Sequence, residues 1–275
     1  MQELNGKVAV ITGAASGIGR ATAMALSRAG VRLVIADIDL DGAEGVAREI
    51  EVAGGQAVGT HCDVAAEAAF QQLAETSLKQ FGRVDIVMNN VGVLTSGRPD
   101  ELPIAEWQRI IDINLMSVIR SNHIFLPQLI RQGSGHIVNT ASFAGLYTYA
   151  YDRLPYAATK AAIIQISEGL ALYLRPKGIG VTCLCPGPVK TNIMRSLRSF
   201  STGLDVRGPG PQFSLLDAEV VGDMVVDGIR RNRLLLVTDE KVREILVRRA
   251  QDPDAVLEEQ IRSPHIIMPA KSNPK

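Results

Sequence analysis

Short apolar runs alternate with helical stretches along most of this chain, and this alternation limits the possible folds more than any other feature. Each run has the length of one buried strand, and the stretches between runs are long enough to be crossover helices. The sequence therefore predicts an α/β fold in which a doubly wound parallel sheet carries helices on both faces. The predicted strands are residues 7–12, 32–37, 56–62, 85–89, 136–140, 180–185 and 234–238.

Length and composition predict a single domain over residues 1–262. The chain has 275 residues, of which 46% are hydrophobic and 21% charged, enough for a substantial core. Large apolar side chains interspersed with glycines and prolines predict a mobile lid over about residues 190–216. The prolines at positions 264, 269 and 274 predict a loose tail over residues 263–275.

Composition and charge argue against several other classes of protein. The formal net charge is zero and no strong run of lysines and arginines occurs, so we expect no nucleic-acid partner. The amino terminus lacks the apolar core of a signal peptide, and no charge-free apolar stretch of about 20 residues occurs, so we expect a cytoplasmic protein without a membrane span. Cys62, Cys183 and Cys185 show no disulfide or metal spacing, and the histidines are scattered, so we expect no metal site.

A glycine-rich turn follows the first predicted strand and opens a helix, with the sequence Thr12-Gly13-Ala14-Ala15-Ser16-Gly17-Ile18-Gly19. Glycines allow a tight turn and close approach to a pyrophosphate, and the helix N-terminus favours an anion. Asp37 ends the second strand, where a carboxylate can hold the ribose hydroxyls of adenosine and repel a 2′-phosphate. This pattern predicts NAD in preference to NADP, although Asp37 could instead simply end its strand or cap the next helix.

Tyr156 and Lys160 lie about one helical turn apart, so both side chains are expected on one helix face. The positive charge of Lys160 beside Tyr156 would favour the deprotonated, phenolate form of the tyrosine. Lowering the pKa of a tyrosine from ~10 to the ~7 of a useful base needs roughly 3–4 kcal/mol. The alternative is that this spacing is an accident of an amphipathic helix.

Taken in order, these motifs resemble the short-chain dehydrogenase/reductase family of Rossmann-fold enzymes, over about Lys7 to Thr191. The family's Thr-Gly-x-x-x-Gly-x-Gly motif matches residues 12–19, and its Asn-Asn-Ala-Gly motif matches residues 89–92 with a valine at position 91. The resemblance implies a catalytic set of Asn114, Ser142, Tyr156 and Lys160. It implies that the cofactor is bound by Gly13, Ser16, Gly17, Ile18, Gly19, Asp37, Asp63, Val64, Asn90, Gly92, Tyr156, Lys160, Pro186, Gly187, Val189 and Thr191.

The resemblance also implies a mechanism. Tyr156 would take the hydroxyl proton of an alcohol while hydride passes to the nicotinamide. Ser142 would bind the substrate oxygen, and Lys160 would lower the pKa of Tyr156 and hold the nicotinamide ribose. Asn114 would anchor a water on a proton path, while the residues alone also fit a helix-bend side chain that meets a neighbouring backbone.

Two other functions remain open at this point. A protein with this fold could bind a dinucleotide only to sense redox state, although all four catalytic positions are filled here. An epimerase or dehydratase of the related extended family would be expected to have a different glycine spacing and a longer substrate domain.

The remaining expectations concern the substrate and the assembly. Four of the five tyrosines lie within residues 147–156, where they line a pocket or pack against the lid. With the apolar lid, they predict a hydrophobic cyclic or aromatic secondary alcohol or ketone. Two helices, after Tyr156 and before His136, are apolar nearly all round, and such helices pair across a two-fold axis in the resembled family. We therefore expect at least a homodimer, with a homotetramer as the alternative.

Overall fold

The centre of the protein is a parallel sheet of seven strands, and each strand begins and ends within one residue of its prediction. The computed structural model describes residues 1–268. Its central strands are β1 (Val8–Thr12), β2 (Arg32–Asp37), β3 (Ala57–His61), β4 (Ile86–Asn89), β6 (Gly135–Thr140), β7 (Ile179–Cys185) and β10 (Leu235–Val237). They run in the order β10-β7-β6-β4-β1-β2-β3, and every neighbouring pair is parallel. The order reverses beside β1, which pairs with β2 and β4, so the predicted doubly wound sheet is confirmed.

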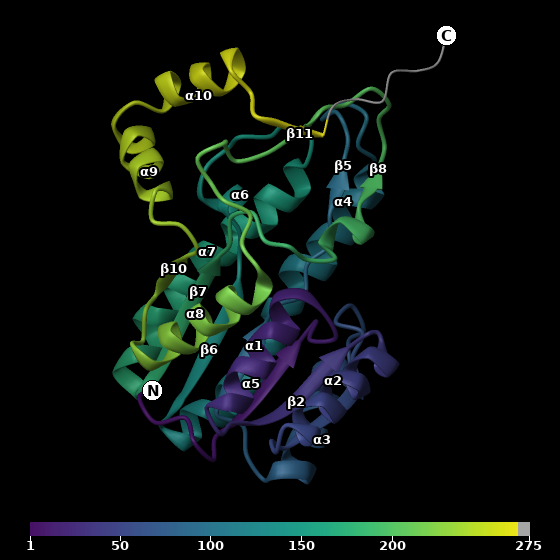
Figure 1. Cartoon of the computed structure of the whole chain (residues 1–275), viewed down its shortest axis with the longest axis vertical. Coiled ribbons are helices and arrows are strands. Elements are labelled where there is room, and N and C mark those ends of the chain that lie inside the picture. The colour runs from purple at the N-terminus through teal and green to yellow at the C-terminus, as the bar shows by residue number, and fades with distance from the viewer. Residues whose placement is uncertain (269–275) are drawn as a thin grey trace.

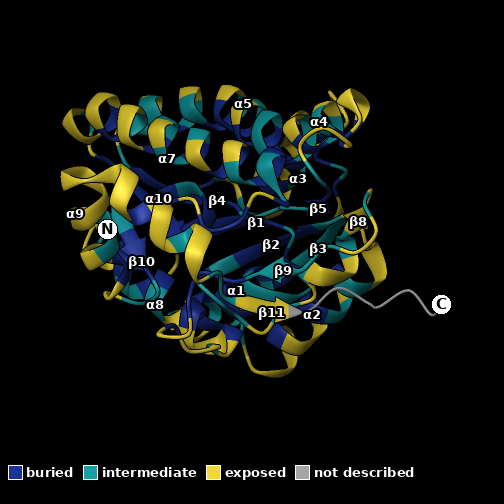
Figure 2. Cartoon of the chain, turned by 90° about the horizontal axis from the view of Figure 1, so that it is seen from above, coloured by how far each residue is buried: buried dark blue, intermediate teal, exposed yellow. Residues whose placement is uncertain are grey.

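Helices cover both faces of this sheet (Figure 1, Figure 2). One layer consists of α1 (Gly17–Arg28), α2 (Leu40–Val52) and α8 (Ala218–Arg230), and the other of α3 (Ala69–Phe81), α5 (Ser117–Gln132) and α7 (Leu154–Leu174). Successive strand residues face opposite layers, because Ala9 and Ile11 join one core and Val10 joins the other. Strands buried on both faces explain the continuous apolar runs in the sequence.

Shorter elements lie around the sheet's carboxyl edge. They are β5 (Thr95–Ser96), α4 (Ile104–Ile111), α6 (Phe143–Leu146), the 3₁₀ turn η3 (Ile193–Ser196), β8 (Arg198–Ser199) and β9 (Val206–Arg207). Another 3₁₀ turn, η2 (Arg175–Lys177), joins α7 to the beginning of β7 at the opposite edge. A π-helical turn, η1 (Asp112–Met116), joins α4 to α5. Within the predicted lid, β8 pairs with β5, so this segment lies over the loop that follows β4.

The carboxyl-terminal segment differs from its prediction. After β10 the chain forms α9 (Val242–Gln251) and α10 (Pro253–Arg262), and these helices carry it across the top of the molecule in Figure 1. Strand β11 (Ile266–Met268) then pairs antiparallel with β9 of the lid, and Gly208 N donates to His265 O at 2.7 Å. A loose tail is therefore wrong for residues 263–268. Pro264 precedes the paired residues, so its missing N–H does not interrupt them. Residues 269–275 of the predicted tail lie outside the described residues.

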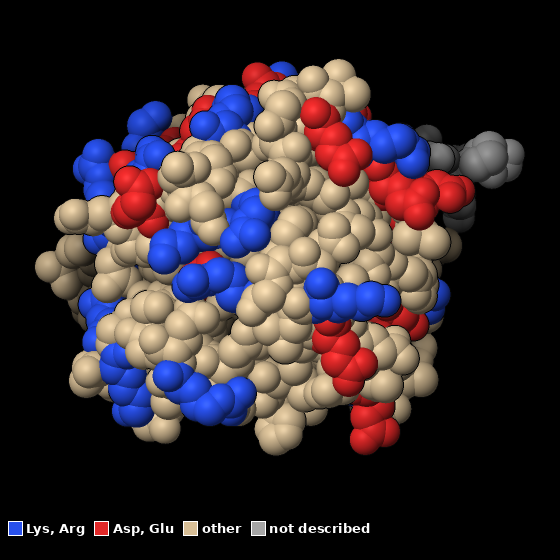
Figure 3. Space-filling model, turned by 90° about the horizontal axis from the view of Figure 1, so that it is seen from below, with Lys and Arg blue, Asp and Glu red and all other residues tan. Residues whose placement is uncertain are grey.

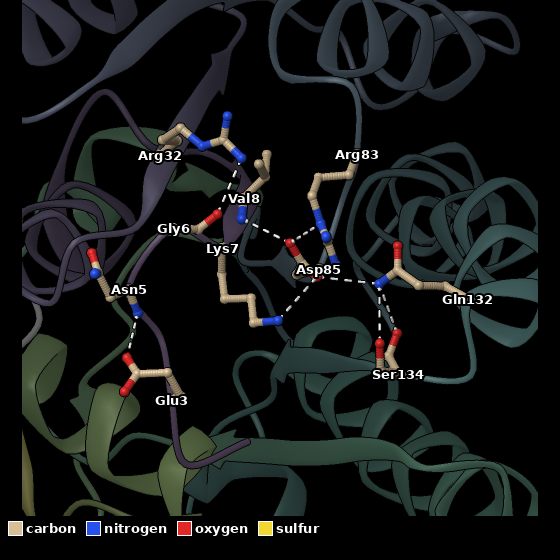
Figure 4. Close-up of polar contacts among 10 residues, drawn as sticks. All are labelled: Glu3, Asn5, Gly6, Lys7, Val8, Arg32, Arg83, Asp85, Gln132 and Ser134. Atoms are coloured by element: carbon tan, nitrogen blue, oxygen red, sulfur yellow. Dashed lines mark hydrogen bonds and ion pairs between the residues drawn. The ribbon is translucent and has the colours of Figure 1, made fainter.

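A buried carboxylate ties three strands together at the amino edge of the sheet (Figure 4). Asp85 precedes β4, and its side chain is fully buried. It accepts hydrogen bonds from Val8 N at 3.0 Å, from Arg83 Nε at 2.8 Å and from Gln132 Nε2 at 3.2 Å, and Lys7 Nζ lies 3.9 Å away. Its backbone bonds β1 and β6 as well. The aspartate therefore fixes the register of β1, β4 and β6 where these strands begin.

The face seen from below carries basic and acidic side chains in scattered groups, separated by uncharged residues (Figure 3). Several of the protein's exposed charges form ion pairs, such as Arg28 with Asp223 at 2.7 Å. Within residues 1–268, no helix has the length and apolar character needed to cross a membrane.

Candidate active site

The predicted site residues gather at the carboxyl edge of the sheet. They follow β1, β2, β3, β4, β6 and β7 in turn, and Tyr156 and Lys160 come from α7. Parallel strands present all their carboxyl ends at one edge, and ligands of doubly wound sheets bind there, at the point where the strand order reverses. Here that point lies between β1 and β4.

The turn after β1 has no room for larger residues. Gly13 and Gly17 have φ angles of +66° and +55°, which favour glycine. A Cβ atom on Gly19 would lie 2.2 Å from the carbonyl oxygen of Gly13. Ser16 caps α1 with extended backbone, and its side chain makes no capping hydrogen bond within the described residues. The backbone can thus approach a diphosphate at the start of α1, so these residues fit a dinucleotide.

A hollow opens beside this turn, with Gly17 and Arg20 on one side and Lys190 and Thr191 on the other. A Cβ atom on Gly17 would lie 3.2 Å from Thr191 Cβ, which shows how closely the segment after β7 approaches. Arg20 and Lys190 were not among the predicted cofactor residues. Each is paired with a carboxylate, Glu49 or Asp217 respectively.

Asp37 has a structural role at this turn. Its Oδ2 accepts from Ala15 N at 2.9 Å, and its Oδ1 accepts from Asp39 N at 3.1 Å. Asp39, not Asp37, caps α2 by accepting from Gly42 N. The cap alternative for Asp37 is therefore wrong, and its carboxylate holds the glycine-rich turn beside β2.

The motif after β4 connects the glycine-rich turn to β6. Asn90 Nδ2 donates to Gly13 O at 3.1 Å, and its Oδ1 accepts from Thr140 Oγ1 at 3.3 Å. Gly92 lies against Lys160, because a Cβ atom there would be 3.2 Å from Nζ. After β3, Asp63 Oδ1 accepts from Ala65 N. Val64 is buried at this edge.

The segment after β7 runs along the same edge. Phe143 N donates to Pro186 O at 2.9 Å, and Gly187 N donates to Thr238 Oγ1 at 2.8 Å. A Cβ atom on Gly187 would lie 2.7 Å from the Phe143 ring, so glycine is needed for this contact. Val189 bridges to Leu216 and so ties the two ends of the lid together. Ile18, by contrast, packs partly buried against the core below the turn.

Ser142 and Tyr156 are both buried at the catalytic end of this edge. Ser142 is the N-cap of α6, and its Oγ accepts from Ala144 N at 3.2 Å. Burial raises the pKa of Tyr156, while a hydrogen bond with Ser142 and the positive charge of Arg153 oppose the rise. The serine hydroxyl and the phenol therefore form a pair that can share a hydrogen bond with one substrate oxygen.

Lys160 lies one turn along α7 with only 2% of its surface exposed. Its Nζ donates to Thr140 O at 2.7 Å and lies 5.6 Å from the centre of the Tyr156 ring. Burial lowers the pKa of Lys160 to about 8. The predicted shared face is confirmed, whereas the lowering of the Tyr156 pKa by Lys160 stays a prediction.

Asn114 lies in the π-helical turn and is fully buried. Its Oδ1 accepts from Val93 N at 2.8 Å, and its Nδ2 donates to Val93 O at 3.0 Å. A helix-bend side chain that meets a neighbouring backbone is therefore what the structure shows. Such π turns often occur at functional sites. They point a side chain or carbonyl group in a direction that a regular α-helix would not allow.

The tyrosines before Tyr156 have different environments. Tyr147 is 2% exposed and donates to Pro209 O at 2.7 Å, so it packs against the lid. Tyr149 is buried beside it, with ring centres 5.3 Å apart. Tyr151 is 39% exposed and lies under the Arg207 guanidinium. For Tyr147 and Tyr151 the structure supports packing against the lid.

Thr140 and Arg153 contribute to the site although the sequence did not identify them. Thr140 acts through its backbone carbonyl, which no residue type signals. Arg153 immediately precedes α7, three residues before Tyr156, and a charge so close to a suspected base was an available clue. Cys183 and Cys185 share one face of β7, with their sulfurs 3.9 Å apart. Among the described residues, no group of three His, Cys, Asp or Glu side chains is placed to hold a metal.

Several known proteins are similar to this chain. A family model described as short chain dehydrogenase matches residues 7–202. Cyclohexanol dehydrogenase from Acinetobacter sp. (strain SE19) is 37% identical over 193 residues, which cover 70% of this chain and 76% of that protein. The 7alpha-hydroxysteroid dehydrogenase of Escherichia coli (strain K12) is 33% identical over 194 residues, covering 70% and 75%. A short chain dehydrogenase/reductase from Burkholderia phymatum, solved in complex with NAD, has a TM-score of 0.83 at 31% identity and covers 93% of this chain and 96% of its own.

Proposed function

Because this chain belongs to the short-chain dehydrogenase/reductase family, we propose that it transfers hydride between NAD(H) and a hydrophobic cyclic or aromatic secondary alcohol or ketone. It is an oxidoreductase that acts on CH–OH groups with a nicotinamide dinucleotide. The observation that carries the proposal is the meeting of Ser142, Tyr156 and Lys160, all buried, at the edge where the glycine-rich turn lies.

In the oxidising direction, the hydroxyl proton of the alcohol passes to the deprotonated oxygen of Tyr156 as the C–H bond breaks and the carbonyl forms. The bound nicotinamide supplies the hydride acceptor. The Ser142 hydroxyl donates to the substrate oxygen and stabilises the negative charge that develops there. Lys160 holds its ammonium beside Tyr156, and Thr140 O keeps it in place. Asn114 fixes the backbone of Val93 beside the site and, in this proposal, anchors the proton path to solvent.

A panel of secondary alcohols and ketones, followed by the absorbance of the reduced nicotinamide, tests this function. Cyclic alcohols such as cyclohexanol are expected to be oxidised, as the names of two relatives suggest by analogy. Binding of NADH without turnover of any member of the panel would instead favour a redox-sensing protein. Much better turnover of charged sugars would contradict the hydrophobic substrate.

For the cofactor, we propose NAD over NADP by at least ~10-fold in kcat/KM. The two hydrogen bonds of Asp37 to backbone N–H groups keep its carboxylate at the end of β2, where it would repel a 2′-phosphate. Asp37→Ala is expected to weaken NAD far more than NADP, with Asp41→Ala, an exposed acid in the first turn of α2, as the control. Equal use of both cofactors by the wild type would contradict this assignment.

For the assembly, we propose a homodimer that covers the outer faces of α5 and α7, with a homotetramer built from such dimers as the alternative. Leu172 is 83% exposed and Tyr173 54% exposed on α7, and Ile119 on α5 is 40% exposed. Apolar side chains at such exposure on neighbouring helices favour a second burial surface. Light scattering at micromolar concentration tests the proposal, and a monomer would contradict it.

A further inference from the structure

The carboxylate of Asp152 lies beside the site and is not fully paired. Its side chain is only 1% exposed. Oδ2 accepts a long hydrogen bond of 3.4 Å from Ser96 Oγ and lies 3.4 Å from Arg153 Nη2. Oδ1 has no hydrogen-bond partner within residues 1–268. An unpaired buried acceptor is costly, so this oxygen calls for a partner from outside the chain.

Asp152 and Arg153 line a cavity of about 10 Å³ under the lid. That volume is close to the minimum for one water-sized group. Most of the remaining wall is apolar and comes from Leu94, Met194, Leu197 and Val206.

The polar groups around this cavity are mostly engaged. Ser96 already donates to Asp152, Thr95 Oγ1 donates to Arg198 O, and Arg153 Nη2 donates to Arg207 O. A trapped water needs two to four polar partners, whereas Asp152 Oδ1 is the one buried side-chain oxygen or nitrogen of this wall that lacks a hydrogen-bond partner within residues 1–268. A hydroxyl carried on an apolar skeleton matches it better, because such a group needs one acceptor and apolar contacts.

The cavity adjoins the catalytic end of the site. Leu94 and Leu197 of its wall pack in the same apolar cluster as Tyr149 and Tyr156. Asp152, which is also in the wall, precedes Tyr156 by four residues. The carboxylate and the catalytic phenol therefore border the same apolar cluster.

We propose that Asp152 binds a second hydroxyl group of the substrate, at the end of an apolar skeleton away from the carbon that is oxidised. This inference rests on the proposed function and names its substrate class, which is apolar diols and the corresponding hydroxyketones. The charges of Asp152 and Arg153 offset each other, so a neutral donor fits this place better than an ammonium or a carboxylate.

Matched pairs of alcohols test the inference with the full chain and NAD. The first set compares cyclohexanol with 1,3- and 1,4-cyclohexanediol. The second set has a larger skeleton and compares 2-decalol with decalindiols. After correction for equivalent hydroxyls, we expect kcat/KM to be at least ~10-fold higher for the best diol than for its mono-alcohol, as one buried hydrogen bond of ~1.4 kcal/mol would give.

Variants connect that preference to the carboxylate. Asp152→Ala is expected to remove the preference by lowering kcat/KM for the diol alone. Asp152→Asn keeps the shape and one acceptor oxygen, so it should fold like the wild type and retain part of the preference. Asp100→Ala, which removes an exposed acid from the loop after β5, should leave the ratio unchanged.

A binding measurement separates this inference from the proposed function. In the presence of NADH, the diol should raise the Tm of the wild type more than the mono-alcohol does, and Asp152→Ala should abolish the difference. Turnover of both alcohols at equal kcat/KM, with equal shifts in Tm, would overturn the second-hydroxyl site and leave hydride transfer standing. Preferential binding of the diol without turnover would support the site and refute hydride transfer. Neither binding nor turnover of any pair would overturn both.

Discussion

The two edges of the central sheet differ in how fully their buried charged groups are paired. At the amino edge, Asp85 is fully buried and accepts hydrogen bonds from Val8 N, Arg83 and Gln132, with the Lys7 ammonium 3.9 Å away (Figure 4). At the carboxyl edge, Lys160 is just as deeply buried but donates one hydrogen bond within the described residues, to Thr140 O. The same sheet thus carries one fully paired charge and one that is barely paired.

The amino edge of the sheet stabilises the fold, whereas the carboxyl edge holds the groups suited to chemistry. Burial without full pairing lowers the pKa of Lys160 to about 8. A group whose pKa lies close to neutral pH is useful in proton transfer, whereas a fully paired carboxylate only holds strands together. Substitutions at the amino edge should therefore lower the free energy of unfolding, and substitutions at the carboxyl edge should lower the rate of turnover.

Tyr156→Phe should have the largest effect and should separate the two edges most clearly. Removal of the proton-transferring hydroxyl is expected to lower kcat by roughly 10²–10⁴-fold, while NADH still binds and Tm stays close to that of the wild type. Stopped-flow absorbance and fluorescence titration measure the two effects. Near-normal turnover would remove Tyr156 from its catalytic role.

Asp85→Ala should do the reverse. The change leaves Val8 N and Gln132 without their acceptor at the amino edge, and we expect a loss of roughly 3–4 kcal/mol in the free energy of unfolding. The folded fraction should keep the kcat/KM of the wild type, because the site lies at the opposite edge. Urea unfolding measures the loss, with Glu3→Ala, an exposed acid nearby, as the control. A drop in kcat/KM at full folding would show that the two edges are coupled.

Lys160 should give the carboxyl edge a pH dependence that the amino edge lacks. In the folded chain it loses its proton near pH 8, whereas in the unfolded chain it keeps it to about 10.5, so the unfolded state binds more protons between these values. Stability should therefore rise with pH in that window. Relative to Lys160→Met, the wild type should gain roughly 2–3 kcal/mol between pH 8 and pH 10.

Urea unfolding at several pH values tests this gain. The other ionisable groups are common to both proteins, so their contributions cancel in the difference. Lys79→Met, which changes an exposed lysine of α3, should follow the wild type at every pH. If the free energy of unfolding changed with pH in the same way for Lys160→Met and the wild type, burial would not disfavour the charged form of Lys160.

The sheet and the order of the site residues could be predicted because they depend on local patterns. Every central strand is an apolar run bounded by turn residues, and the glycines of residues 13–19 are needed by backbone angles and close contacts that glycine alone allows. The motifs also follow the strands in the order in which the family has them.

The carboxyl-terminal strand and the surroundings of the site could not be predicted, because they depend on contacts between distant segments. Strand β11 pairs with β9 about 60 residues earlier, and three residues with a proline nearby carry no strand signal. Thr140 holds Lys160 through a backbone carbonyl, which every residue possesses. The partial pairing of Asp152 depends on Ser96, more than 50 positions away. Sequence periodicity shows which face of a helix or strand is buried, but it does not show which distant segment packs against that face.

Tyr147→Phe should give the smallest change in stability and turnover. It tests whether a single hydrogen bond helps to hold the lid at the carboxyl edge. The Tyr147 hydroxyl donates to Pro209 O at 2.7 Å and ties the lid to the loop before α7. The ring remains in the variant, so only this bond is lost, and we expect a loss of about 1 kcal/mol in the free energy of unfolding. Looser closure of the lid should also raise KM a few-fold with little change in kcat. Tyr173→Phe is the matched control, because its ring lies on the outer face of α7 at 54% exposure. If both variants had the KM and stability of the wild type, the lid would be held by its strand pairs β5–β8 and β9–β11, and the carboxyl edge would be better fastened than its unpaired charges suggest.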